Sequence, residues 1–393
     1  MTYLKSEFPE KMRYASPDEK KEYFKSVVKP HQFFQDAVKE IMSVLKSGRA
    51  NLIFVCGPPG VGKEALAYRL IEIIYELMLP ELKNDPGRIP VGMISLRAPG
   101  SSRPTWPMIH RKAMLAMNEP LVDKKVDYKG IFDGKGLATG KRNRSNTLPV
   151  LLDAHIETLK QRKPYAFIFN EAQHLTLVAN AQRLVHNLEY VKTIADESKV
   201  PHILIGTYTL YEFKIRSGQI IRRSKNIHFP RYRADVPEEL EIFKKILVTL
   251  LRQLPLEKVP DPAANGMLEF FIARCVGCVG ILRDWLVDAL SKTLELGLTE
   301  LTYEILEMTA LPESECLLLT MGAMKGEQLI AGPKNAHSLL WQVLGFEEAD
   351  SDLKVILDQY FSPYFKLNKP EKKGNRRPGV RNPTRDPVGV PLC

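Results

Sequence analysis

Cysteines are scarce in this chain of 393 residues: there are five, and they are scattered along the sequence. An odd number of cysteines in a long chain does not indicate a disulfide framework. Cys275 and Cys278 form a single CxxC, without a second pair of cysteines or a nearby pair of histidines. Because a zinc site needs about four ligands, we interpret these two cysteines as small apolar residues on a helix.

Long hydrophobic runs are absent as well, since none reaches the ~18 residues that a membrane helix requires. The opening residues, MTYLKSEFPEKMRY, are too polar for a signal peptide. We therefore expect a cytoplasmic protein without a membrane partner, located at the nucleoid if it binds DNA.

The composition is that of a globular protein with an excess of positive charge. Hydrophobic residues make up 44% of the chain and charged residues 26%, which is enough apolar surface to bury cores. The length allows two or three folding units at roughly 100–200 residues each. The net charge of +10 favours an anionic partner, most commonly nucleic acid, although a surface with surplus lysine would give the same charge.

Strand-like and helix-like segments alternate between residues 30 and 236. Apolar runs typical of buried strands occupy residues 51–56, 91–96, 165–170, 202–206 and 226–229. Segments with helical apolar spacing lie among them, at residues 30–45, 64–78, 148–161 and 180–197. This alternation predicts an α/β fold in which a parallel sheet is flanked by helices.

The pattern becomes wholly helical after Pro237, which predicts a separate helical lid. The last residues hold seven Lys or Arg against two acids, with several prolines and few apolar residues, so we expect them to be disordered when free. We divide the chain into an N-terminal extension at 1–29, an α/β core at 30–236, a helical lid at 237–310, a C-terminal helical extension at 311–366 and a disordered basic tail at 367–393.

The motif GPPGVGK at residues 57–63 has the GxxxxGK form of a phosphate-binding loop, between an apolar strand and a helix. Its glycines let backbone N–H groups surround phosphate oxygens, and the helix N-terminus adds a positive dipole end. The alternative is a Gly/Pro turn that happens to precede a helix. We expect ATP and Mg²⁺ as ligands, and the expected nucleotide-binding residues are Gly57, Pro58, Pro59, Gly60, Val61, Gly62, Lys63, Glu64 and Ala65.

A second motif, FIFNEAQHL at residues 167–175, is an apolar strand that ends in two polar residues. In a P-loop ATPase the first normally binds Mg²⁺ and the second activates the attacking water. Glu171 is therefore the predicted catalytic base. The alternative is a strand that merely ends at the surface.

Two positions at the predicted metal site depart from the usual pattern. Glu64 stands where a Ser or Thr hydroxyl normally binds Mg²⁺, and Asn170 stands where an aspartate is usual. One hypothesis is a compensated exchange that keeps the ligand charge and makes Glu64 and Asn170 the metal ligands. The other is a degenerate site that binds ATP but hydrolyses it slowly.

Five segments in order resemble the AAA+ ATPases of bacterial DNA transposition, the TnsC/TniB group. They are VKPHQFF, GPPGVGK, FIFNEAQHL, ILIGTYTL with GQIIRRSKNIHFPRY, and CVGILRDWL, over roughly residues 28–295. The resemblance implies an AAA+ core, which would comprise residues 30–236. It also implies an ATP-dependent regulator that oligomerises on duplex DNA and recruits or activates a transposase.

The resemblance also implies roles for individual residues. Thr207 occupies the sensor-1 position, where a polar side chain orients the lytic water. Arg222 or Arg223, with a slight preference for Arg223, is the expected arginine finger for the neighbouring subunit's γ-phosphate. Arg283 fits the sensor-2 position on the lid. Two further residues correspond to the region that borders the adenine: Pro30 and His31.

Members of this family form rings or helical filaments around duplex DNA, so the resemblance implies a homo-oligomer that binds DNA independently of sequence. The expected contacts come from residues 97–103 and from the polar, basic segment 119–147. The candidate DNA-binding residues are Arg103, Lys124, Lys125, Lys129, Lys135, Lys141, Arg142 and Arg144. The other implied partners are a transposase and a target-selection protein, which is either a DNA-binding protein or a CRISPR-guided complex.

Three other functions compete with a transposition ATPase. An ATP-binding DNA scaffold with little or no hydrolysis is favoured by Glu64 and Asn170. A P-loop kinase for a small molecule would need neither a sensor-2 lid nor a basic insertion. A loader of the replication-initiator type should carry a C-terminal helix-turn-helix, and none is evident in residues 311–366.

Overall fold

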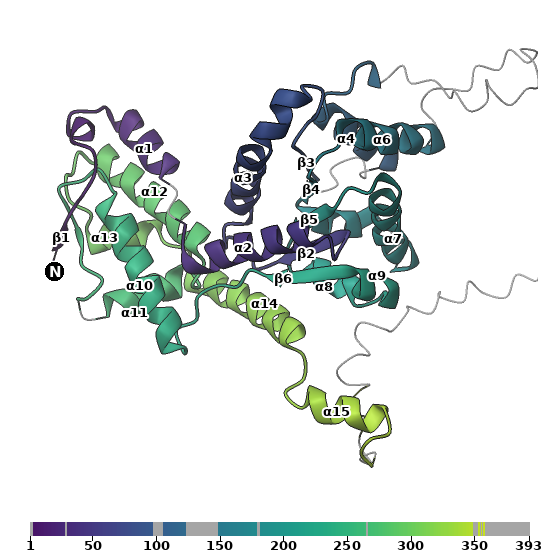
Figure 1. Ribbon diagram of the computed structural model, residues 1–393. Helices are drawn as coiled ribbons and strands as arrows, with labels where there is room; N and C mark the ends of the chain where they lie inside the picture. The colour runs from purple at the N-terminus through teal and green to yellow at the C-terminus, as the bar shows by residue number, and fades with distance from the viewer. Residues whose placement is uncertain are drawn as a thin grey trace, which may run out of the picture.

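The computed structural model describes residues 3–27, 30–96, 105–122, 148–178, 181–264 and 266–348, together with residues 353, 355 and 357. An α/β core and a mostly helical lid lie beside each other, and a long helix, α14, extends from the lid along the core (Figure 1). Among the described residues, no helix has both the length and the apolarity needed to span a bilayer.

The core contains a five-stranded parallel sheet in the order β3-β4-β5-β2-β6. Its strands are β2 (Leu52–Cys56), β3 (Val91–Ser95), β4 (Ala166–Asn170), β5 (His202–Gly206) and β6 (Ser224–His228). Cys56 at the end of β2 pairs with Gly206 of β5 and His228 of β6, so the carboxyl ends of the central strands are level. The parallel α/β sheet predicted from the sequence is confirmed.

Helices cover both faces of this sheet, which explains why its central strands are continuously apolar. On one face, α2 (Gln32–Ser47) and α3 (Lys63–Asn84) pack against Ile53 and Val55 of β2. On the other face, the alternate residues of β2, including Phe54, pack against a second group of helices. These are α4 (Trp106–Ala116), α6 (Leu148–Arg162), α7 (Ala181–Ser198), α8 (Tyr208–Lys214) and α9 (Gly218–Arg223).

The lid has its own hydrophobic core, and residues 3–27 contribute to it. Its helices are α10 (Pro237–Arg252), α11 (Met267–Arg274), α12 (Val279–Glu295) and α13 (Tyr303–Thr309). The strand β1 (Tyr3–Lys5) pairs antiparallel with β7 (Lys258–Pro260). Between β1 and the core come η1 (Glu10–Arg13) and α1 (Pro17–Ser26), and Phe24 of α1 is fully buried in the lid. The segment predicted as an N-terminal extension is therefore packed into the lid.

The interpretation of Cys275 and Cys278 as residues within a helix was wrong. Both are buried, but Cys275 follows the last residue of α11 and Cys278 precedes the first residue of α12. Val276 and Gly277 have positive φ angles of 56° and 69°. This left-handed pair ends α11 and reverses the chain into α12.

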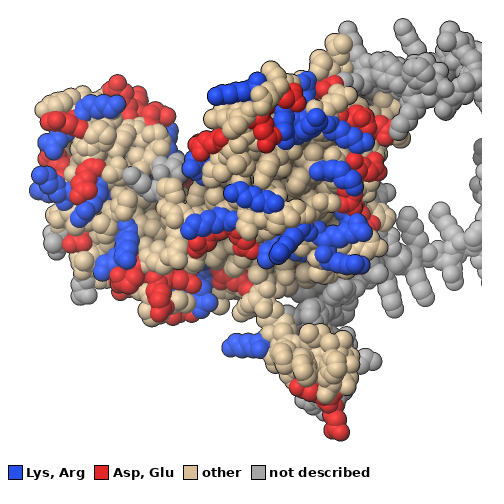
Figure 2. Space-filling view, in the orientation of Figure 1, with Lys and Arg blue, Asp and Glu red and all other residues tan. Residues whose placement is uncertain are grey.

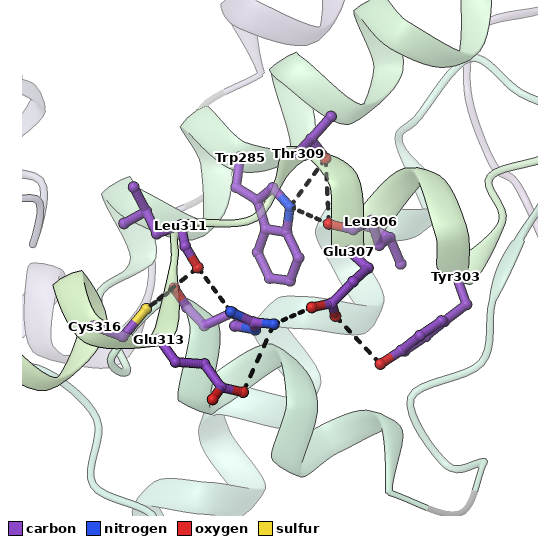
Figure 3. A network of polar contacts seen from close by, with 9 residues as sticks. Trp285, Tyr303, Leu306, Glu307, Thr309, Leu311, Glu313 and Cys316 are labelled. Atoms are coloured by element: carbon purple, nitrogen blue, oxygen red, sulfur yellow. Dashed lines mark hydrogen bonds and ion pairs between the residues drawn. The ribbon is translucent and has the colours of Figure 1, made fainter.

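The C-terminal extension contains α14 (Glu313–Ala331) and α15 (Ala336–Val343). At the start of α14, the guanidinium of Arg274 donates to Leu311 O at 2.9 Å and contacts the carboxylates of Glu307 and Glu313 (Figure 3). Further along, Glu327 accepts two hydrogen bonds from Arg231, which follows β6. The helix α14 is therefore anchored to the lid at one end and to the core at the other.

Candidate nucleotide-binding site

The loop of residues 57–63 joins the end of β2 to α3 and follows a path that only glycine fits at several positions. A Cβ at Gly57 would lie 2.1 Å from Phe229 O. Gly60 and Gly62 have φ angles of 72° and 106°, in the left-handed region where other residues are strained. The glycine spacing seen in the sequence thus reflects both close backbone contacts and an unusual backbone conformation.

Lys63, the first residue of α3, directs its ammonium into this loop. Its Nζ donates to Pro58 O at 2.6 Å and to Gly57 O at 3.2 Å, and the residue is only 7% exposed. Burial lowers the pKa of Lys63 to about 8, and the nearby carboxylate of Glu171 opposes this shift. A phosphate in the loop would favour the charged ammonium further, because it adds an anion to a poorly solvated site.

The other residues predicted to contact nucleotide differ in their exposure. Glu64 is exposed in the first turn of α3, where the helix dipole favours a carboxylate. Pro58 and Val61 are buried, whereas Gly62 and Ala65 are half-buried and Pro59 and Gly60 are exposed.

The lid contacts the loop directly through the first turn of α12. The N–H of Ile281 donates to Gly60 O at 3.0 Å, and a Cβ at Gly280 would lie 2.3 Å from the same oxygen. A Cβ at Gly277 would lie 1.9 Å from Tyr232 O, in the segment that links β6 to the lid. Sequence reasoning did not identify these contacts, although the spacing of Gly277 and Gly280 was visible.

Asn170, the last residue of β4, is buried beside the end of β3. Its Nδ2 donates to Ser95 Oγ at 3.3 Å, and its Oδ1 is a buried atom without a hydrogen-bond partner among the described residues. Magnesium is bound in proteins by oxygen atoms, usually from one or two side chains together with phosphate. The orphaned Oδ1 of Asn170 and the carboxylate of Glu64 are oxygen atoms of the kind that magnesium binds, so the donor chemistry of these residues suits the ion.

Glu171 follows Asn170 with a φ of 54°, a conformation that is uncommon for a residue with a side chain. Its carboxylate accepts a hydrogen bond from Gln173 Nε2. Gln173 Oε1 in turn accepts from the N–H of Thr207, at 3.2 Å. The structure therefore links the predicted base to the predicted sensor-1 residue through Gln173, a residue that sequence reasoning missed although it belongs to the same motif.

The two candidate finger residues end α9 and are both exposed. Arg223 donates to Asp196 Oδ2 at 3.2 Å, while Asp196 Oδ1 accepts from Asn51. Arg222 forms no ion pair within the described part of the chain. The two arginines thus differ, because Arg223 is paired with an aspartate of its own subunit and Arg222 has no such pair among the described residues.

Both arginines lie at the amino-terminal end of the parallel strands, whereas the phosphate-binding loop of their own chain lies at the carboxyl-terminal end. The residue after them, Ser224, pairs with Leu52 at the start of β2, whereas the loop follows Cys56 at its end. The length of β2 separates the two places by roughly 13 Å, at about 3.3 Å per residue. Neither arginine is therefore positioned to reach a phosphate bound in its own subunit.

Arg283, the predicted sensor-2 residue, lies on α12 and donates to the carbonyl oxygen of Lys25 in α1. Its Nε is buried without a partner among the described residues. The contact adds a connection between the N-terminal segment and the helix that touches the phosphate-binding loop.

His31, the residue predicted to border the adenine, belongs to an aromatic cluster beside the loop. Its Nδ1 lies 2.9 Å from Tyr232 Oη, and its ring stacks on Phe229 at 5.9 Å between centroids. Burial lowers the pKa of His31 to about 4, so the ring is neutral at physiological pH. Because Phe229 O also contacts Gly57, this cluster forms an apolar wall next to the loop, whereas Pro30 is exposed.

The candidate DNA-binding residues, Arg103, Lys124, Lys129, Lys141, Arg142 and Arg144, lie outside the described residues, as do Lys125 and Lys135. Lys and Arg side chains gather on one face of the core, over α2, β6 and α9 (Figure 2). We call this surface the basic face, and its exposed cations are Lys39, Lys46, Arg49, Arg222, Arg223 and Lys225.

Residues 46–213 match the sequence profile of the family described as AAA domain. No curated protein matches the chain in sequence. The ORC2 protein of Aeropyrum pernix in its ADP form is 13% identical, with a TM-score of 0.47, covering 74% of this chain and 71% of that one.

Two other solved structures have similar scores. Drosophila ORC bound to DNA is 14% identical, with a TM-score of 0.46, covering 79% of this chain and 69% of that one. A Walker-type ATPase of Pyrococcus abyssi is 16% identical, with a TM-score of 0.44, covering 86% and 93%. On the profile match of residues 46–213 and the sheet topology, the chain has the AAA+ P-loop fold, as predicted.

Proposed function

We propose that this chain is an ATPase that assembles on double-stranded DNA when it holds ATP, and that it regulates DNA transposition. The observation that carries the proposal is the phosphate-binding loop, with buried Lys63 inside it and Glu171 close enough to act on the charge of Lys63. A cationic loop and a carboxylate at the carboxyl end of parallel strands are two of the parts that ATP hydrolysis requires.

In the proposed reaction, the loop N–H groups and Lys63 hold the phosphates of ATP, and Glu171 orients a water molecule. The water oxygen forms a bond to the γ-phosphorus while the bond to the ADP oxygen breaks, and the carboxylate of Glu171 takes the water's proton. ADP and phosphate then leave. A magnesium ion held by Glu64 and Asn170 would neutralise phosphate charge.

The proposal includes a homo-oligomer, because the two candidate finger arginines lie away from the loop of their own chain. Arg222 and Arg223 lie at the other end of the strands from the loop, so we assign them to the nucleotide bound by a neighbouring copy. An arginine supplied in this way offsets charge in the transition state and makes hydrolysis depend on assembly. A ring and a helical filament both satisfy this requirement.

Double-stranded DNA is the proposed polyanion. The net charge of +10 and the exposed cations of the basic face (Figure 2) support it. Contacts from lysine and arginine to phosphate give an affinity that is independent of sequence and falls steeply with salt. A transposase and a target-selection protein are the proposed protein partners, and they rest on the family resemblance of the motifs.

The second candidate is an ATP-binding DNA scaffold that hydrolyses little ATP. It is favoured by the exchanged residues at the predicted metal site, Glu64 and Asn170. Both candidates bind ATP and DNA, so only the rate of hydrolysis separates them.

The deciding experiment is electron microscopy of the protein with duplex DNA, in ATP, a slowly hydrolysed analogue, ADP or no nucleotide. We expect rings or filaments on DNA with ATP and the analogue, and none with ADP. Phosphate release from the same samples then distinguishes the ATPase from the scaffold. Absence of ATP binding with magnesium, together with DNA binding that ignores nucleotide, would end both proposals.

The assignment to transposition needs a separate assay. Insertion of a donor element into a target plasmid is counted with the wild-type chain and with Lys63→Ala. We expect insertions to require the wild-type loop. An equal number of insertions without the protein would remove transposition from the proposal and leave the ATPase in place.

A further inference from the structure

Gln173 connects two parts of the site that are far apart in sequence. It lies in η3 (Ala172–Val178), directly after the predicted base. Its side-chain amide donates through Nε2 to Glu171 Oε2 and accepts through Oε1 from the N–H of Thr207, at 3.2 Å. Both ends of one amide are thus used to join β4 to the turn that follows β5.

The space for this connection depends on Gly206, the last residue of β5. A Cβ at Gly206 would lie 2.6 Å from Gln173 Oε1 and 3.2 Å from Gln173 N. Gly206 also accepts the N–H of Gly57 through its carbonyl oxygen, at 3.3 Å. The phosphate-binding loop, the end of β5, Gln173 and Glu171 therefore form one continuous chain of contacts.

The carboxylate of Glu171 is held by the hydrogen bond from Gln173. Glu171 stands at a left-handed position directly after the strand, and its side chain is only half-buried. Its charge acts on Lys63, so the carboxylate lies on the side of the site where phosphate would bind. A base must be held within hydrogen-bond reach of the proton that it abstracts.

We propose that Gln173 is a positioning residue that fixes the Glu171 carboxylate relative to the backbone of Thr207. The proposal rests on the ATPase function proposed above and names how its base is held. A primary amide suits this role because it offers a donor and an acceptor together. An ionised carboxylate at this position keeps only the acceptor, and a methionine side chain of similar length offers no N–H donor and only a weak acceptor.

The first test needs no nucleotide: hydrogen exchange of the Thr207 amide in wild type, Gln173→Met and Gln173→Glu. We expect exchange at least fivefold faster in Gln173→Met, because the acceptor is lost, and close to wild type in Gln173→Glu, which keeps it. Gln161→Met, an exposed position on α6, is the control and should not change. Unchanged exchange in Gln173→Met overturns the proposal.

The second test measures ATP hydrolysis by the DNA-bound oligomer. We expect kcat to fall about tenfold in Gln173→Met while KM stays within twofold, because a base out of position affects the chemical step more than binding. In Gln173→Glu, kcat should recover as the pH is lowered, because a protonated carboxyl can again donate to Glu171. Gly206→Ala should reproduce the loss by displacing the amide.

The outcomes separate this proposal from the ATPase itself. Wild-type protein that hydrolyses no ATP overturns both. Wild-type hydrolysis with an unchanged or increased kcat in Gln173→Met overturns only the positioning role. A parallel loss of kcat, ATP affinity and thermal stability in Gln173→Met, with no pH-dependent recovery in Gln173→Glu, would mean that Gln173 only maintains the fold.

Discussion

At the scale of single residues, the two exchanged positions of the predicted metal site offer the clearest experiment. We expect Glu64→Thr and Asn170→Asp each to weaken magnesium-dependent ATP binding by about tenfold, because each changes the charge around the ion by one unit. The double variant restores the total charge, so its affinity should return to within about threefold of wild type. Binding of a fluorescent ATP analogue, with and without magnesium, measures all four proteins.

The control is the same series without magnesium, where the four proteins should differ little. If the losses of the two single variants simply add in the double variant, the two residues do not share an ion. The hypothesis of a compensated exchange would then be wrong.

The adjacent arginines at the end of α9 are also distinguished at this scale. The sequence slightly favoured Arg223 as the finger, but Arg223 is paired with Asp196 at 3.2 Å in its own subunit. Arg222 is exposed and unpaired within the described residues, so the structure shifts our preference to Arg222. We expect Arg222→Ala to lower DNA-stimulated hydrolysis by about 10³-fold or more, with a smaller effect of Arg223→Ala.

Mixing variants tests whether the arginine acts on a neighbouring copy. Arg222→Ala keeps an intact loop and Lys63→Ala keeps an intact arginine, so a mixture of the two should hydrolyse ATP although neither does alone. The double variant mixed with Arg222→Ala is the matched control and should stay inactive. Failure of the first mixture to recover activity would place the arginine outside the shared site.

At the scale of elements, a largely buried ion pair contributes to the attachment of the helix α14 to the core. The Arg231 and Glu327 side chains are 14% and 18% exposed, and their contacts are 2.9 and 3.3 Å long. Removing one partner of a largely buried pair leaves a poorly solvated charge. We expect Glu327→Gln to weaken the docking of α14 by about 2 kcal/mol, measured as faster hydrogen exchange in α14.

The same helix supplies a control. Lys325 contacts Glu212 of α8 at 3.7 Å, but its side chain is 70% exposed. Such surface pairs contribute little, so Lys325→Gln should leave exchange in α14 nearly unchanged. Equal effects of the two substitutions would show that burial does not determine the strength of this contact.

At the scale of the whole molecule, buried histidines make stability depend on pH, and three of them are fully buried. His110, His155 and His202 are fully buried between the sheet and its helices, and His110 Nδ1 lies 3.0 Å from His155 Nδ1. Burial lowers the pKa of His110 and His202 to about 4, and that of His155 well below its ordinary value. The folded protein therefore keeps all three neutral at a pH where the unfolded chain protonates them.

The sign of the effect follows from proton uptake on unfolding. Below about pH 6.5 the histidines of the unfolded chain bind protons, whereas the buried histidines of the folded chain stay neutral. The free energy of unfolding therefore falls as the pH decreases towards 4. At pH 5.5 each of these histidines should lower the free energy of unfolding by about 1 kcal/mol. Urea midpoints at pH 7.5 and 5.5 measure the loss. The control is His337→Gln, which changes an exposed histidine and should show the same loss of stability between the two pH values as the wild type. Equal urea midpoints of the wild type at the two pH values would contradict the prediction.

Much of the core was predictable because its signals are local. Each central strand is a short apolar run, and GPPGVGK stands between such a run and a helix. These patterns reflect burial on both faces of a parallel sheet and the backbone demands of a phosphate-binding turn. For this reason the parallel sheet and the position of the loop were predicted correctly, even though strand and helix ends differ by a few residues.

By itself, the sequence determined which segments form the sheet, where the phosphate-binding loop lies and which carboxylate follows the strand β4. Only the tertiary structure decided how distant segments complete the site. In the folded chain β1 pairs with β7, and the N–H of Ile281 donates to Gly60 O. Gln173 connects Glu171 to Thr207 through two hydrogen bonds. Such contacts depend on where the chain returns in space, and neither local periodicity nor a motif encodes that.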